Sequence, residues 1–281
     1  MPGTLFLVAT PIGNLEDMTT RAVKVLTKAD LIAAEDTRHT LQLLNHFAIK
    51  GRLVRYDEHN KDKEGPVLLK ELLEGKNIAL VSDAGFPGIA DPGEAMAALA
   101  VENGITVVPV PGANAALTAL VASGLAATPF FFGGFLPKTK RNRTEQLQKW
   151  EHIPATVILY EAPHRVKEVL QEILAAWGDR KIAIGRELTK LHEEFWRGTV
   201  SGALEHLAAN PPRGEFVLVL EQGAPLAMAP PTEDPLEAVK KLIAGGIPKK
   251  EALAQIAKEN KIPRRELYNR LLQEDAEKDK F

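Results

Sequence analysis

The first 125 residues of the chain repeat one pattern, in which a short apolar run is followed by a longer amphipathic stretch. This alternation is typical of a mostly parallel, doubly wound α/β sheet. Strands of such a sheet are buried on both faces, and the uncharged run Ile78–Val81 fits that environment. The predicted strands are residues 5–9, 30–34, 53–56, 78–81 and 106–110.

Four polar or glycine-bearing loops follow these strands. They comprise residues 10–17, 35–39, 82–91 and 111–114. Because the carboxyl ends of parallel strands lie at one edge of a sheet, and ligands of open α/β sheets bind outside that edge, we expect the four loops to share a pocket.

The stretch 81–93, VSDAGFPGIADPG, is the strongest candidate for a ligand loop. Gly85 and Gly88 remove side chains where the backbone approaches a ligand, and Pro87 stiffens the loop. Asp83 remains as a polar contact. The stretch is longer than an ordinary strand-to-helix connection of about 2 to 6 residues.

Simple helix capping is the alternative interpretation of several acidic residues here. Asp91 suits an N-cap, with Pro92 as the first helical residue, and Glu16 and Asp17 suit helix N-termini. Neither a GxGxxG sequence nor a P-loop lysine is present, which disfavours a pyrophosphate ligand. A cationic ligand with a ribose and an amino group, such as S-adenosylmethionine, suits the acidic loops better.

A second α/β unit is predicted over residues 126–222, after a first domain at 1–125. Two of its strands are followed by loops rich in acids and bases, 161–165 and 187–194. These loops predict a cleft between the two domains, although a charged stretch such as 186–198 also suits an exposed hairpin. The predicted strands are 130–132, 156–160, 181–186 and 216–220, and the predicted helices are 143–150, 166–177 and 203–210.

A proline-rich linker at 223–234 and a small helical domain at 235–281 complete the predicted organisation. Three helices are expected at 236–244, 249–258 and 264–272, and the latter two are spaced like a helix-turn-helix. Residues 240–270 carry six Lys and three Arg against three Glu, whereas the whole chain has a net charge of −2. A basic unit of this kind is either a solvated bundle or a nucleic-acid contact.

Several chemistries find no support in the sequence. The chain has no cysteine, which excludes disulfides and thiolate chemistry, and its seven histidines show no paired ligand spacing, so no metal site is predicted. A Gly-x-Ser-x-Gly elbow is also missing. The N-terminal residues do not resemble a signal peptide, and prolines and glycines interrupt the uncharged stretch 104–137. We therefore expect a cytoplasmic protein without a membrane partner.

Seven motifs together resemble the ribosomal RNA small subunit methyltransferase I family, a branch of the tetrapyrrole methylase superfamily. In chain order they are ATPIGNLEDMT, AAEDTR, VSDAGFPGIADPG, VPVPGANAALTALVASGL, GFLPKTKRNR, LYEAPHR and RELTKLHEEFWRG. The resemblance implies a class III methyltransferase fold of two α/β domains with a small C-terminal helical appendage. It also implies a homodimer that uses S-adenosylmethionine to methylate a cytidine ribose 2′-hydroxyl in the decoding region of small-subunit ribosomal RNA.

The resemblance also implies cofactor-contacting segments, carried over here residue by residue. Ser82, Asp83 and Ala84 stand where tetrapyrrole methylases tend to have Gly-Asp-Pro. The implied cofactor residues are Pro11, Gly13, Asp83, Ala84, Gly85, Phe86, Pro87, Asn114 and Ala115.

Methyl transfer to a hydroxyl requires alignment of the reacting atoms and removal of a proton, and alignment supplies the larger part of the acceleration. Our hypothesis gives Glu187, Lys190 and Glu161 as candidate bases. Arg38 and Arg165 are candidates for steering the phosphates beside the target ribose.

A loop with Lys138, Lys140, Arg141 and Arg143 is a further candidate for phosphate contact, or a surface loop. Since the target ribose must be reached in folded RNA, we expect the assembled subunit to be the substrate. Two alternatives remain open at this stage, namely a methylase of a tetrapyrrole or another small molecule, and a ribosome-binding module without turnover.

Overall fold

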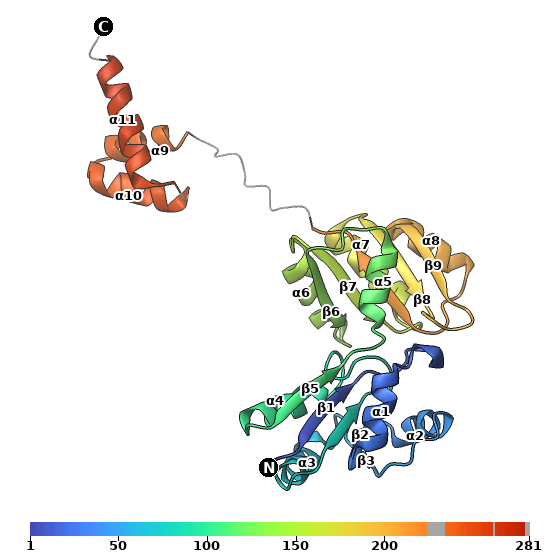
Figure 1. Cartoon of the computed structure of the whole chain (residues 1–281). Coiled ribbons are helices and arrows are strands. Elements are labelled where there is room, and N and C mark those ends of the chain that lie inside the picture. Colours follow the sequence, from blue (N-terminus) through green and yellow to red (C-terminus); the bar gives the residue numbers. More distant parts are fainter. Residues whose placement is uncertain (224–233, 261, 279–281) are drawn as a thin grey trace. The chain divides into compact units, whose positions relative to one another are not determined.

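The computed structural model describes residues 1–223, 234–260 and 262–278 of the chain. They belong to two compact units, Met1–Ala224 and Pro225–Phe281 (Figure 1). The first unit contains two five-stranded sheets and the second contains helices. The predicted two-sheet α/β fold with C-terminal helices is confirmed.

All strands of the first sheet run parallel, in the order β3-β2-β4-β1-β5. Five predicted strands are therefore present, with bounds that differ by a residue at some ends. The strands are β1 Thr4–Val8, β2 Leu31–Ala34, β3 Leu53–Arg55, β4 Ile78–Val81 and β5 Thr106–Val110. The helical segments are η1 Leu15–Asp17, α1 Thr20–Lys28, α2 Thr37–His46, α3 Lys61–Leu73, α4 Gly93–Glu102 and α5 Ala115–Ser123.

Burial on both faces explains why the central strands of this sheet lack charge. Every residue of β2 and β4 is buried, and alternate residues enter separate clusters on the two faces. Leu31 and Leu80 pack on one face, whereas Ile32 and Val81 pack on the other. The carboxyl ends of the strands face the second sheet (Figure 1). Their loops therefore reach that sheet.

The second sheet has the order β6-β7-β10-β8-β9 and mixes strand directions. β6 and β7 are parallel, whereas β10 runs antiparallel to both of its neighbours. Antiparallel pairing of β8 with β9 forms a hairpin over 181–199, and the stretch 186–198 covers the end of β8, the connecting loop and most of β9. The stretch is therefore part of a hairpin, but it is not wholly exposed, because Leu188 in its loop is buried. The sequence analysis missed β9. The elements are β6 Phe130–Phe135, α6 Lys140–Trp150, β7 Thr156–Glu161, α7 Val166–Trp177, β8 Lys181–Arg186, β9 Glu194–Thr199, α8 Val200–Ala209 and β10 Phe216–Leu220.

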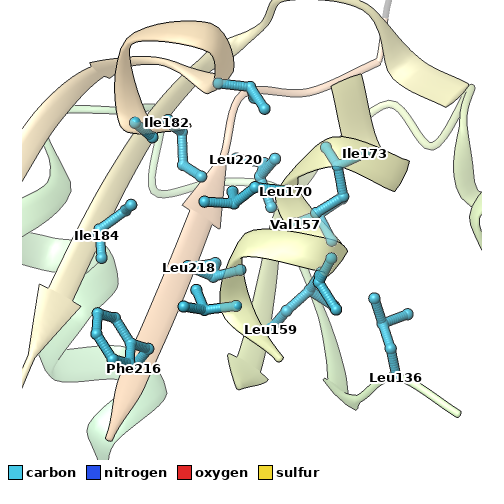
Figure 2. Packing of buried hydrophobic residues seen from close by; sticks show 14 of the residues in the cluster. Leu136, Val157, Leu159, Leu170, Ile173, Ile182, Ile184, Phe216, Leu218 and Leu220 are labelled. Atoms are coloured by element: carbon cyan, nitrogen blue, oxygen red, sulfur yellow. The ribbon is translucent and has the colours of Figure 1, made fainter. Parts of the chain in front are cut away.

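One face of the second sheet packs under α7 and α8. Figure 2 shows Leu170 and Ile173 of α7 against Val157 and Leu159 of β7, all fully buried. Burying a large aliphatic side chain contributes roughly 1.5–3 kcal/mol. The apolar packing therefore fixes the sheet, and with it the polar loops that follow its strands.

Arg143 was a candidate phosphate contact in the sequence, and the structure contradicts that expectation. Its side chain is 3% exposed, donates to both carboxylate oxygens of Glu172 and to Glu168, and also donates to the Lys138 carbonyl. The ion pairs, opposed by burial, raise the pKa of the guanidinium. Arg143 is therefore a structural cation that anchors the loop before α6, and it is not available to a phosphate.

The second unit is a bundle of α9 Pro235–Ala244, α10 Lys249–Glu259 and α11 Arg264–Lys278. The three predicted helices are present, and α11 continues six residues beyond its predicted end. Leu236, Val239, Leu253 and Leu267 form its buried core. Most of the predicted linker, at 224–233, lies outside the described residues. None of the described helices combines the length and apolar character needed to cross a membrane.

Candidate functional site

A cleft of about 430 Å³ lies where loops of the first sheet meet the second sheet. This volume is within the roughly 300–1,000 Å³ range of small-molecule sites. Loops after β2, β4 and β5 contribute one wall, and residues from β7 and β10 contribute the other. Its lining comprises Ile12, Glu35, Ser82, Asp83, Ala84, Gly85, Phe86, Ile89, Ala90, Asp91, Asn114, Ala115, Phe135, Tyr160, Glu161, Ala162, Pro163, Leu188, Glu215, Phe216 and Val217.

The loop after β4 is held in a conformation that requires glycine. Gly85 has φ +80° and Gly88 has φ +87°, which L-residues rarely adopt. The N–H of Gly85 donates to the Thr10 carbonyl, and the N–H of Thr10 donates to the Gly85 carbonyl, at 3.1 and 2.9 Å. This pair of bonds joins the loops after β1 and β4 into one floor.

Asp91 holds the turn before α4 and lines the cleft. Its Oδ1 accepts hydrogen bonds from the N–H groups of Gly88 and Gly93, at 2.8 and 2.9 Å. The helix begins at Gly93, with Pro92 in the N-cap position, so the sequence prediction placed its start one residue too early. The bonds from Gly88 and Gly93 occupy one oxygen of Asp91, and the residue also belongs to the cleft wall.

The cleft is strongly acidic. Five carboxyl groups line it, from Glu35, Asp83, Asp91, Glu161 and Glu215, and within the described part of the chain no Lys, Arg or His joins them. Burial and the charge of Asp83 raise the pKa of Glu35, and burial raises the pKa of Asp91. A cation in the cleft would relieve this repulsion, whereas a pyrophosphate would add to it.

Glu161 is the most deeply buried of these acids. Its side chain is 1% exposed, Oε1 accepts the Ala162 N–H at 2.8 Å, and Oε2 has no hydrogen-bond partner. The Arg165 guanidinium lies 3.5 Å from Oε2. Burial raises the pKa of Glu161, while the Ala162 N–H and the Arg165 charge oppose that rise. One fixed oxygen and one unsatisfied oxygen make Glu161 suited to accept a proton.

Tyr160 and the turn before α5 tie the two sheets together at the cleft. The Tyr160 hydroxyl accepts the N–H of Ala116 at 3.1 Å, and the Asn114 side chain caps α5 by accepting the Leu117 N–H. Because this arrangement occupies only the acceptor side of the phenol, the hydroxyl proton remains to be donated.

Glu187 and Lys190 form an ion network beside the cleft and do not line it. Lys190 Nζ donates to Glu187 and to Glu215, both at 2.9 Å, and the Glu215 N–H donates to Glu187. Burial opposes the charged state of each, but these bonds outweigh it, so the pKa of Lys190 is raised and that of Glu187 lowered. Lys190 therefore stays protonated at neutral pH, and Glu187 is a weakened base.

Close packing connects this network to the first sheet. A Cβ on Gly13 would lie 2.4 Å from Lys190 Cγ, so glycine is required where the loop after β1 passes under Lys190. Glu187 and Thr189 have φ +50° and +66°, uncommon values for residues with side chains. Gly13 thus acts beside the cleft, by allowing the two domains to approach.

The four candidate phosphate contacts have different surroundings. Arg38 is 88% exposed and pairs with Asp36, and Arg141 pairs with Glu145 on the surface of α6. Lys140 is exposed at the start of that helix. Arg165 is largely buried and donates to the carbonyls of Leu136 and Pro137, which favours a structural role in holding the loop after β6.

The structure brings seven of the predicted site residues into the cleft lining and leaves others beside it. Glu35 and Glu215 are acids that sequence reasoning did not assign, and Tyr160 and Phe216 are aromatic neighbours that it also missed. The sequence did point toward Glu35, because this residue begins one of the four loops that were predicted to share a pocket. The residues in the lining are Asp83, Ala84, Gly85, Phe86, Asn114, Ala115 and Glu161, whereas Pro11, Gly13, Pro87, Glu187, Lys190, Arg38, Lys140, Arg141 and Arg165 are outside it.

A family model and several known proteins match most of the chain. The family described as Tetrapyrrole (Corrin/Porphyrin) Methylases matches residues 4–204. Ribosomal RNA small subunit methyltransferase I from Halalkalibacterium halodurans is 49% identical, covering 95% of this chain and 94% of the relative. The protein of the same name from Synechocystis sp. is 47% identical, covering 98% and 99%, and that from Bacillus subtilis is 47% identical, covering 95% and 93%.

Solved structures show the same fold at low sequence identity. Uroporphyrin-III C-methyltransferase from Thermus thermophilus, complexed with S-adenyl homocysteine, has a TM-score of 0.55 at 19% identity and covers 78% of this chain and 97% of its own. The methyltransferase CobJ has a TM-score of 0.60 at 18% identity, covering 79% and 95%. Diphthine synthase has a TM-score of 0.59 at 15% identity, covering 78% and 90%.

Proposed function

Because this chain belongs to the tetrapyrrole methylase family and, within it, to the ribosomal RNA small subunit methyltransferase I family, we propose that it methylates a cytidine ribose 2′-hydroxyl in small-subunit ribosomal RNA. The methyl donor is S-adenosylmethionine. The observation that carries this proposal is the charge of the cleft. Its lining has five carboxyl groups, and none of the described lining residues is Lys, Arg or His. Such a cleft suits a ligand with a sulfonium and an ammonium group.

The residues of the cleft fit this donor. Gly85 and Ala84 leave room at the floor, and Asp83, Asp91 and Glu35 supply negative charge around it. We assign the donor to the loop at Asp83 to Pro87 and the turn at Asn114 and Ala115, with Pro11 and Gly13 supporting the floor from the loop after β1. When bound, the donor supplies a methyl group already activated by its positive sulfur.

The chain's own residues must align the acceptor hydroxyl and remove its proton. Rigid alignment supplies roughly 7–11 kcal/mol, and a positioned base about 10² to 10⁴-fold. We assign the base to Glu161, which lines the cleft and whose Oε2 has no hydrogen-bond partner, in preference to Glu187 and Lys190. Lys190 instead holds Glu215 at the cleft wall.

The surroundings of the reaction follow from this substrate. Arg38, Lys140 and Arg141 are exposed and are proposed to contact RNA phosphates around the cleft. We also propose that the enzyme is a homodimer in the cytoplasm and that it acts on the assembled small subunit. The cytoplasmic location follows from the substrate, because ribosomal subunits are assembled in the cytoplasm.

The charge of the cleft predicts how donor binding depends on pH. Burial raises the pKa of Glu35, Asp91 and Glu161, so these carboxyls ionise at a higher pH than ordinary Asp and Glu side chains do. S-Adenosylmethionine should therefore bind more tightly at pH 7 than at pH 5 and release protons on binding. Isothermal titration in buffers of different ionisation enthalpy measures both effects.

S-Adenosylhomocysteine is a matched control for that titration, because it lacks the sulfonium charge and keeps the rest of the molecule. Its affinity should change less with pH, and ATP should bind weakly. Equal pH dependence for the two ligands, or ATP binding as tight as that of S-adenosylmethionine, would argue against the acidic cleft as a cation site.

The helical unit is proposed to contribute to RNA binding. Removing residues 232–281 should weaken binding to small subunits by roughly tenfold or more, since several Lys and Arg are lost. Affinity for S-adenosylmethionine should stay unchanged, because every lining residue of the cleft belongs to the first unit. Sedimentation with subunits measures the first affinity and titration calorimetry the second. A loss of affinity for S-adenosylmethionine would contradict the proposal that the helical unit contributes to RNA binding alone.

A further inference from the structure

A second cavity, of about 330 Å³, lies beside the donor cleft on the side of the sheet covered by α8. Phe216 lines both cavities, so they meet at the first residue of β10. Figure 2 shows Phe216 and Ile184 at the same side of the core cluster, on β10 and β8. The lining of this side pocket comprises Ile184, Arg186, Glu194, Trp196, His206, Leu207, Asn210, Pro211, Pro212, Arg213 and Phe216.

Two stacked rings form part of the side pocket. The rings of Trp196 on β9 and His206 on α8 have centroids 5.6 Å apart and planes inclined by 25°. Packing fixes Trp196, because a Cβ on Gly198 or Gly202 would approach its six-membered ring to 2.5 or 3.4 Å. Rigid aromatic groups of this kind are the usual platforms for unpaired nucleic-acid bases, since every base has a π face.

The charge of the side pocket is opposite to that of the donor cleft. Arg186 pairs with Glu194 at 2.9 Å, so that arginine is largely neutralised locally. Arg213 is exposed, and no carboxylate among the described residues is within ion-pair distance of it. An arginine at the mouth of an aromatic pocket provides a contact for the phosphate attached to a stacked base.

We propose that the side pocket binds an unpaired RNA base next to the nucleotide whose ribose enters the donor cleft. This inference rests on the proposed function, because it names the part of the RNA substrate that enters the side pocket. Because Phe216 lines both cavities, groups bound in the two cavities would be neighbours along one strand. Trp196 and His206 provide the stacking surface, and Arg213 contacts the backbone phosphate outside.

Two variants of the full-length enzyme test the side pocket without touching the donor cleft. Asn210→Trp places an indole at the pocket, and Ala208→Trp places the same group on an exposed site of α8 outside it. Arg213→Glu reverses the charge at the mouth, and Arg52→Glu makes the same reversal at an exposed site on the first domain. The substrate is purified small ribosomal subunits without this methyl group, with tritiated S-adenosylmethionine.

The expected result is an increase in KM for the subunits of roughly tenfold or more for Asn210→Trp and Arg213→Glu, from lost stacking or a repelled phosphate. The control variants should remain near wild type, and all four should keep wild-type affinity for S-adenosylmethionine. Ultraviolet cross-linking of the wild-type complex should join Trp196 or His206 to a nucleotide within one or two positions of the methylated one.

The results of these experiments distinguish a failure of the side-pocket proposal from a failure of the proposed function. If the wild-type enzyme labels the RNA but both pocket variants keep the wild-type KM, the side pocket is not an RNA site and the methyltransferase assignment stands. Cross-links to a ribosomal protein or to a distant nucleotide also overturn the inference. If the wild-type enzyme labels no RNA in the subunits, both proposals fail.

Discussion

Replacing Glu161 by glutamine is expected to lower the single-turnover rate of RNA methylation by about 10² to 10⁴-fold, the usual contribution of a positioned base. Glutamine keeps the shape of the side chain and can keep the 2.8 Å bond from the Ala162 N–H. It cannot take up the proton of the ribose hydroxyl. Affinity for S-adenosylmethionine should fall only modestly, because four other cleft carboxyls remain.

The pH dependence of the rate gives an independent signature of this base. Only the ionised form of Glu161 accepts a proton, and burial raises its pKa above the ordinary 4.5. The wild-type rate should therefore rise with pH through that raised pKa and then level off. The Glu161→Gln enzyme should lack this rise, because its remaining rate does not depend on a carboxylate at residue 161.

Glu187→Gln and Lys190→Met are the matched comparisons, since both residues were equal candidates in the sequence. Each should stay within about tenfold of the wild-type rate, because their ion network lies beside the cleft and a base that is tightly paired contributes little. A normal rate for Glu161→Gln, or a larger loss for Lys190→Met, would show that the base has been assigned to the wrong residue.

Replacing Gly85 by leucine is expected to weaken binding of S-adenosylmethionine by about 100-fold or more, which corresponds to about 2.7 kcal/mol. The residue lines the cleft, and even a Cβ there would come 3.3 Å from Ile12 Cγ2 and 3.7 Å from the Ala113 carbonyl oxygen. A leucine must therefore either fill part of the cleft or displace the floor that the bonds between Thr10 and Gly85 hold together.

Gly124→Leu separates this effect from backbone strain. Gly124 has the same φ of +80°, but no atom lies within 4 Å of a Cβ built on it, and it follows α5 outside the cleft. Both variants should lose about 1–2 kcal/mol of unfolding free energy from the left-handed conformation. Only Gly85→Leu should lose donor affinity, as measured by calorimetry, and equal losses in both would refute a direct role for this loop.

The first sheet was predictable because its strands follow simple rules. Ile78–Val81 is uncharged since it is buried on both faces, and the loop after it was identified because the carboxyl ends of parallel strands share an edge. The same rule missed Glu215 and Phe216. Glu215 directly precedes β10 and Phe216 is its first residue. β10 is an antiparallel strand that presents its amino end to the cleft, and strand direction in a mixed sheet is not encoded in apolar periodicity.

Side-chain partners explain the remaining differences. In the sequence, Arg143 is equivalent to Lys140 and Arg141 as a basic residue of one loop, but folding brings Glu168 and Glu172 of α7 to its guanidinium. Glu161, Glu187 and Lys190 were equal candidates for the base. Only the structure shows that the latter two neutralise each other while one oxygen of Glu161 stays without a hydrogen-bond partner. Contacts between distant segments decide these roles.

The most direct test of the proposed activity is to identify the product. Small ribosomal subunits that lack the modification are incubated with the enzyme and tritiated S-adenosylmethionine, and the RNA is then hydrolysed with alkali and sequenced around the label. Because cleavage by alkali requires a free 2′-hydroxyl, a methylated ribose leaves an uncut dinucleotide. Methylation of a cytidine ribose should leave the label in one such dinucleotide that begins with cytidine, with almost none from Glu161→Gln. Label on a base, on ribosomal protein, or nowhere in the subunit would contradict it.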